Sequence, residues 1–103
     1  MKAITLRNKE EEYLKIDKIF KNLENIDIID LIASKEEIFK NKEETEEILS
    51  YINLIFFDKI KSNTRYIECM NIIEETRDRL SKNNNYEMTI DNFIMAVWEV
   101  VNG

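Results

Sequence analysis

The sequence predicts an all-α fold, a bundle of five to six helices. Three observations carry this prediction: the 103 residues include no proline, the one glycine is the terminal Gly103, and apolar residues recur at spacings of three and four. Sheets with tight turns, phosphate-binding loops and flexible linkers usually need glycine or proline. A chain of this length has a sizeable core and forms one domain.

The first helix is expected over residues 7–23. Its inner side carries large apolar residues at helical spacing: Tyr13, Ile16, Ile19, Phe20 and Leu23. Residues 1–6 fall outside this pattern, and we interpret them as the remnant of a longer segment. The helical domain is therefore expected over residues 7–103.

Two short helices are expected next. The apolar run at residues 27–33 predicts the first of them. Ser34 and Glu37 have the spacing of a capping box, in which the serine hydroxyl and the glutamate carboxylate each bond a free backbone N–H. This spacing predicts a separate helix over residues 34–40.

The following helix is expected from an N-cap at Asn41 to about residue 62, with acidic first turns that suit the positive end of the helix dipole. Its apolar residues surround the helix axis instead of forming one stripe. A helix that is apolar all round is buried all round. This helix is therefore either the central post of the bundle, or one of its sides binds a partner.

The last two helices form a pair. Thr64 is the expected N-cap of a helix that reaches about residue 80, with an inner stripe of Tyr66, Cys69, Met70, Ile73 and Leu80. The asparagines at 83–85 predict a helix stop and a turn, because asparagine tolerates the left-handed conformation and its amide bonds nearby backbone.

The final helix is expected to begin at an N-cap on Thr89. Its inward residues are Ile90, Phe93, Ile94, Val97 and Val101. Met95 and Trp98 lie off this stripe. They widen the apolar arc beyond what a peripheral helix requires.

Composition excludes several functions. The net charge of −6 has the wrong sign for a groove that follows nucleic-acid phosphates. The longest uncharged run, residues 48–57, is far shorter than the ~18 residues of a membrane span. With no basic and apolar leader at its start, the sequence suggests a cytoplasmic protein.

Catalytic and metal-binding patterns are also missing. The sequence contains no histidine, so the common zinc sets, the di-iron Glu-x-x-His pair and the familiar nucleophilic triads cannot be assembled. No glycine loop precedes a nucleotide-binding lysine. Cys69, the lone cysteine, is expected to be a small buried apolar residue. We therefore expect no enzyme activity, no cofactor and no small-molecule substrate, and infer a binding function.

Residues 72–101 carry a recognisable pattern. A helix ends in a leucine, an Asn-x-Asn element follows, and a short polar step leads to a final apolar helix; the matching residues are Leu80, Asn83, Asn85, Met88, Ile90, Asp91, Phe93, Ile94 and Trp98. The pattern resembles the C-terminal helical domain of the delta-prime subunit of bacterial DNA polymerase III, part of the clamp loader. Asn84 departs from it, because the family often has valine or another non-amide residue there.

The resemblance implies a collar domain. In that family, one helical domain from each of five subunits packs into a ring that holds the AAA+ modules together while the sliding clamp is loaded. The partners would be the collar domains of the gamma or tau subunit and of delta. Residues 1–6 would then be the remnant of a linker to a missing AAA+ module.

Candidate contact residues follow from the off-stripe positions. Leu54, Phe57, Met95 and Trp98 are expected to form part of the lateral contact between collar domains, with Asn83, Asn85 and Thr89 as turn and cap residues. The alternative is that all four apolar residues belong to the core. Large apolar residues on amphipathic helices usually pack inside, which favours the core for Phe57 and Trp98 and leaves Met95 as the better interface candidate.

Two other functions remain open. An acidic helical domain could be a stand-alone adaptor or a DNA-mimicking inhibitor, but a mimic needs carboxylates along one continuous face. In this chain the acidic residues cluster at helix starts and alternate with lysine. An enzyme would require an active-site pocket, and no sequence motif indicates one.

Overall fold

The computed structural model describes the backbone of residues 2–82 and 85–103, and the side chains from Glu10 onward. Over these ranges the chain forms α-helices joined by turns and one 3-10 turn, η1. The elements are α1 (Lys2–Phe20), α2 (Ile28–Ile38), η1 (Lys42–Glu44), α3 (Thr45–Lys59), α4 (Tyr66–Ser81) and α5 (Tyr86–Asn102). The predicted all-α bundle is confirmed.

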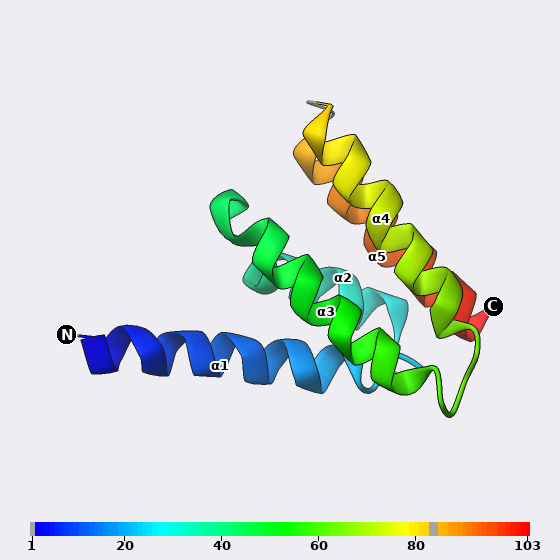
Figure 1. Cartoon of the computed structure of the whole chain (residues 1–103), viewed down its shortest axis with the longest axis horizontal. Coiled ribbons are helices and arrows are strands. Elements are labelled where there is room, and N and C mark those ends of the chain that lie inside the picture. Colours follow the sequence, from blue (N-terminus) through cyan, green and yellow to red (C-terminus); the bar gives the residue numbers. More distant parts are fainter. Residues whose placement is uncertain (1, 83–84) are drawn as a thin grey trace.

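The helices pack as one antiparallel set crossed by α1 (Figure 1). Helix α4 packs against both α3 and α5, and α5 also packs against α2. Helix α1 contacts α2 and α3 and runs across them, and its N-terminal end projects beyond the other helices (Figure 1). Helix α4 therefore forms the joint between the α3 side and the α5 side of the domain.

A chain of aromatic rings links every helix to one core. Phe39, at the C-cap of α2, contacts Phe93 of α5 with ring centroids 6.3 Å apart, and Phe93 contacts Phe20 of α1 at 6.5 Å. Phe20 then contacts Phe56 of α3 at 6.0 Å, and Phe56 contacts Tyr66 of α4 at 5.6 Å. All five rings are buried. Edge and tilted contacts at these distances stabilise beyond simple burial, so the core is continuous.

Helix α1 begins earlier than the sequence predicted. The expectation that residues 2–6 lie outside the helical pattern is wrong, because they form the first turns of α1. They include neither proline nor glycine, and Ile and Thr lower helix propensity by only about 0.7 kcal/mol or less per residue. The helix ends at Phe20, where the Asn22 side chain donates to the carbonyl of Lys18 at 2.8 Å.

The two short helices expected over residues 27–40 are a single helix, α2. Ser34 does not cap a new helix: its hydroxyl donates to the carbonyl of Asp30 at 2.9 Å, within the helix. Leu31 and Ile38 are seven residues apart, and both are buried on the same side. This shared apolar face holds α2 together through the position where the capping box predicted a break.

Helices α3 and α4 begin differently from expectation. Asn41 does act as a cap, since its side chain accepts from the N–H of Glu43 at 3.1 Å, but it caps η1, which leads into α3. Thr64 is not the cap of α4. Arg65 occupies that position without a side-chain cap, and Asn63 accepts from the Arg65 N–H at 3.0 Å.

Helix α5 also begins before its predicted cap. Asn85 holds the N-cap position and accepts from the N–H of Met88 at 3.0 Å. The expected cap at Thr89 is wrong: Thr89 is buried inside the first turns, and its hydroxyl donates to the Asn85 carbonyl at 2.7 Å. Asparagine and threonine both suit an N-cap, and the asparagine that directly precedes the helix takes it. Asn83 lies outside the described residues.

Candidate interaction surfaces

The outer side of α3 exposes two large apolar residues. Leu54 is 64% exposed and Phe57 62% exposed, although α3 buries five other apolar residues on its inner side. Of the two arrangements open for this helix, the structure has the one in which a side faces away from the core. Tyr51 fixes that orientation from the α1 side, because its hydroxyl donates to Asp17 of α1 at 2.8 Å. Burial, followed by this hydrogen bond, raises the pKa of Tyr51.

Helix α4 continues this apolar surface. Arg77 of α4 pairs with Glu46 of α3 at 2.7 Å and donates to Ser50 of α3 at 2.6 Å. Further along this antiparallel pair of helices, the ring of Phe56 contacts the ring of Tyr66. Phe57 and Ile67 each follow one residue after that ring contact, turned outward by the same 100° step. Ile67 is 50% exposed. The register therefore places Phe57 and Ile67 level with each other on the outside of the α3–α4 pair.

We name this surface the α3–α4 face. It is defined by three apolar residues, Leu54, Phe57 and Ile67, and by the exposed acidic residues that share their helix sides, Glu46, Asp58, Glu74 and Asp78. Helical spacing supports the grouping, because Asp58 follows Leu54 by four residues and Glu74 follows Ile67 by seven. The other two acidic residues, Glu46 and Asp78, lie next to Arg77.

Met95 lies on a different surface. It is 48% exposed and borders a shallow depression between α4 and α5, together with Ile72, Thr76 and Ala96. None of the residues lining this depression comes from α3. The structure therefore separates the sequence-predicted contact residues into one group on α3 and one on the α4–α5 side.

Trp98 serves the fold. It is half-buried against the core, and its indole N–H donates to the backbone carbonyl of Ile26 at 2.9 Å. Asn102, one turn later, donates to the carbonyl of Leu23 at 2.9 Å. Both bonds tie α5 to the turn that follows α1. The core alternative therefore describes Trp98 better than the interface hypothesis does.

The structure also exposes apolar residues that the sequence did not single out. They are Leu14 on α1, Ile29 and Ile32 on α2, Ile67 on α4 and Met88 at the start of α5. Each of them stands off the inner stripe of its helix, which is the signal that could have found them. Ile67 is the one whose register adds it to a sequence-predicted group.

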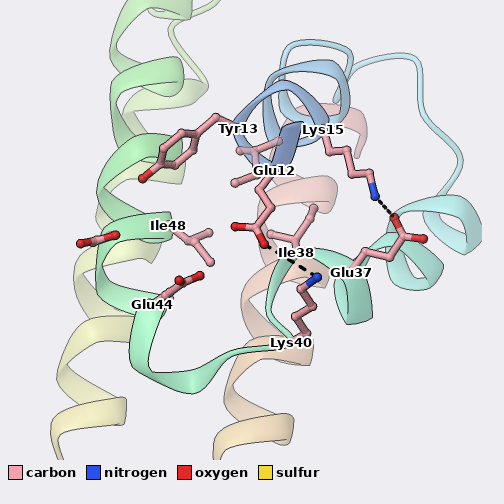
Figure 2. A pocket seen from close by; sticks show the side chains of 10 residues that line it. Glu12, Tyr13, Lys15, Glu37, Ile38, Lys40, Glu44 and Ile48 are labelled. Atoms are coloured by element: carbon pink, nitrogen blue, oxygen red, sulfur yellow. Dashed lines mark hydrogen bonds and ion pairs between the residues drawn. The ribbon is translucent and has the colours of Figure 1, made fainter. Parts of the chain in front are cut away.

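A small cavity lies where α1, α2 and α3 meet (Figure 2). Its rim is closed by two ion pairs: Lys15 of α1 with Glu37 of α2 at 3.2 Å, and Lys40, just after α2, with Glu12 of α1 at 3.7 Å. Figure 2 shows Glu44 among the acidic side chains around the opening. The enclosed space is about 30 Å³, room for a water molecule and not for an organic ligand. The ion pairs join helices here.

A wider depression of about 250 Å³ separates the end of α2 from the start of α5. Lysines line it, but each has a partner within the domain. Lys35 pairs with Asp91, and that hydrogen bond raises the pKa of Lys35. Lys42 lies over the ring of Tyr86 at 5.0 Å, and Lys40 is paired with Glu12. Because these lysines already have partners within the domain, we interpret the depression as a packing boundary between α2 and α5.

Cys69 is buried, as the sequence predicted. Its thiol lies 3.9 Å from the carbonyl of Val97, and burial raises its pKa to about 12. A raised folded-state pKa favours the protonated thiol, so its contribution to stability is full below about pH 9 and is lost as the pH rises toward 12. The reactive species is the thiolate, and here it is suppressed.

We therefore expect Cys69 to be inert in the folded protein at pH 8. A colourless aromatic disulfide reagent should react with the thiol slowly in buffer and within the mixing time in concentrated urea. Rapid reaction in buffer, with circular dichroism unchanged, would show that the thiol is accessible and would contradict its placement between α4 and α5.

The described residues contain no group of three or more His, Cys, Asp or Glu placed to hold a metal ion. Within residues 2–82 and 85–103, no helix is long and apolar enough to cross a membrane. Comparisons with known proteins find no family model, no curated protein and no solved structure that matches this chain. Its function must therefore be argued from these surfaces and from the sequence pattern.

Proposed function

We propose that this chain is a non-catalytic assembly domain, the collar domain of a delta-prime-like subunit of a bacterial DNA polymerase III clamp loader. It would act in the cytoplasm and hold the loader pentamer together while the sliding clamp is loaded. The partners would be the collar domains of the gamma or tau subunit and of delta.

One observation carries the proposal. A domain with a continuous aromatic core still exposes large apolar residues on several helices, among them those of the α3–α4 face and, on a separate surface, Met95 of α5. Contiguous exposed apolar surface on a small protein marks a contact site. A subunit inside a ring needs two such surfaces, one for each neighbour.

The C-terminal helices agree with the resemblance. Residues 72–81 lie on α4 and residues 86–101 on α5, and the two helices pack against each other, with Leu80, Ile90 and Phe93 directed to the core. Asn85 of the Asn-x-Asn element starts the final helix. These features support the proposal.

The adaptor or DNA-mimic alternative has less support. A mimic presents unpaired carboxylates at phosphate-like spacing along one face. Here Glu12, Glu37 and Asp91 are held in ion pairs that join helices. Their charge serves the packing of the domain.

The test is association with the neighbouring collar fragments. We expect the purified domain to sediment with a collar fragment of the gamma or tau subunit, or of delta, from the same organism. Met95→Glu should weaken one of these associations at least about tenfold, because a charge at a desolvated contact has no partner.

Met88→Glu is the matched control, since Met88 is also exposed on α5 and a glutamate near a helix N-terminus is favourable. Equal association of wild type and Met95→Glu would remove Met95 from the contact. No association of the wild-type domain with either fragment would contradict the proposed function.

A further inference from the structure

We infer that the α3–α4 face docks a basic amphipathic helix of a neighbouring protein. The inference deepens the proposed function, and it rests on that function for the identity of the neighbour. Its physical basis is the presence, on one surface, of exposed apolar side chains together with surplus negative charge.

The apolar part is a row of exposed side chains on two adjacent helices. Leu54 and Phe57 stand one helical turn apart on α3, and Ile67 stands level with Phe57 on the antiparallel α4. An amphipathic helix can lay its apolar stripe along such a row of side chains. Shallow depressions border Leu54 on the α1 side, lined by Tyr13, Ser50 and Tyr51.

The charged part consists of exposed carboxylates beside these apolar side chains. Helices α3 and α4 together carry seven Asp or Glu against three Lys or Arg. The nearby cations are already engaged: Lys59 lies over the ring of Tyr66, Arg77 is only 24% exposed between Glu46 and Glu74, and Lys82 pairs with Asp78 at 3.0 Å. Arg79 lines the depression beside Met95 instead. Two carboxylates thus share one guanidinium, and Asp58 adds a further exposed carboxylate.

This combination selects the occupant. A helix with an apolar stripe and no charge would gain from the apolar side chains but not from the carboxylates, whereas a helix that also carries flanking Lys or Arg would gain from both. A second copy of this chain fits poorly, because each copy has a net charge of −6 and brings the same carboxylates to the contact. The fitting partner is a helix with Leu or Ile at i, i+3 or i+4 and i+7, and Lys or Arg beside them.

The experiment uses two synthetic helical peptides with the same leucine stripe, one flanked by lysine and the other by glutamate. Binding to the full 103-residue chain is measured by fluorescence anisotropy, and the site is mapped from amide shifts in the NMR spectrum. We expect the lysine peptide to bind at least about tenfold more tightly than the glutamate peptide. Raising the salt from low to about 0.5 M should remove most of that preference.

Paired variants locate the site. Leu54→Ser with Phe57→Ser should weaken lysine-peptide binding about tenfold, as expected when apolar anchors are lost. The control is Ile29→Ser with Met88→Ser, which removes two equally exposed apolar residues from α2 and α5 and should change binding less than about twofold. Neither pair lies in the core, so both variants should fold.

Three results would overturn the inference. The lysine peptide could fail to bind, or could bind the Leu54 and Phe57 variant as tightly as wild type, or the wild-type chain could dimerise through this face. No clamp-loader subunit is present in this experiment. If the peptide experiment failed, collar assembly would still be tested by sedimentation with the subunit fragments. If the peptide bound but the fragments did not associate, the α3–α4 face would remain a helix-binding surface and the collar function would be rejected.

Discussion

Replacing Phe93 by alanine is expected to lower the free energy of unfolding by about 3–5 kcal/mol. The side chain is almost fully buried, and its ring contacts both Phe20 and Phe39. Removing the ring would cut the aromatic chain between α1, α5 and the end of α2, and would leave a cavity that these helices cannot close without shifting. A domain of this size has about 5–15 kcal/mol of stability, so the variant should be near the limit of folding.

Phe57→Ala is the matched control, the same substitution at an exposed position. We expect it to change stability by less than about 0.5 kcal/mol, because its ring already faces water in the isolated domain. Urea unfolding followed by far-ultraviolet circular dichroism measures both variants. If Phe57→Ala were as costly as Phe93→Ala, α3 would be rotated and its supposed outer side would be part of the core.

Two neighbouring residues show what the sequence alone could predict about burial. Phe56 is fully buried and Phe57 is exposed, although both lie in the same apolar run. Periodicity locates a core when a helix has one apolar stripe, as α5 does, and it predicted that inner side correctly. In α3 apolar residues occur all round, so only the placement of α1 and α4 decides which side faces water.

Helix ends were harder to predict than helix faces. Several residues of the right type compete near each start, and the choice depends on packing elsewhere. Ser34 has capping-box spacing, yet Leu31 and Ile38 share one buried side, and their packing carries the helix through the serine. Thr89 lost the N-cap to Asn85 because tertiary packing extends the helix back to Tyr86, whose hydroxyl is within 2.7 Å of that of Thr45.

The sequence identified some residues of the candidate surfaces and missed others. On α5 the off-stripe position of Met95 indicated an exposed side chain, and on α3 the surplus of apolar residues around the axis made Leu54 a candidate. Ile67 needed the register between α3 and α4, and that register depends on long-range contacts such as the pair between Arg77 and Glu46. Trp98 was ambiguous for a similar reason, since its hydrogen-bond acceptor lies 72 residues away in the chain.

Trp98→Phe tests that long-range contact directly. The substitution keeps an aromatic ring but removes the indole N–H, so the Ile26 carbonyl loses its donor at 2.9 Å. Leaving a part-buried acceptor unpaired costs about 1–3 kcal/mol, and urea unfolding should show a loss of that size. Met95→Leu, an exposed apolar exchange on the same helix, should change stability by less than about 0.5 kcal/mol.

Trp98→Phe also tests whether Trp98 takes part in assembly. If Trp98 ties α5 to the turn after α1, Trp98→Phe should weaken folding while a collar fragment still binds the folded fraction with wild-type affinity. If Trp98 belonged to the contact, stability would be unchanged and association would fall. That second result would move the tryptophan from the fold to the interface and would widen the Met95 surface toward the end of α5.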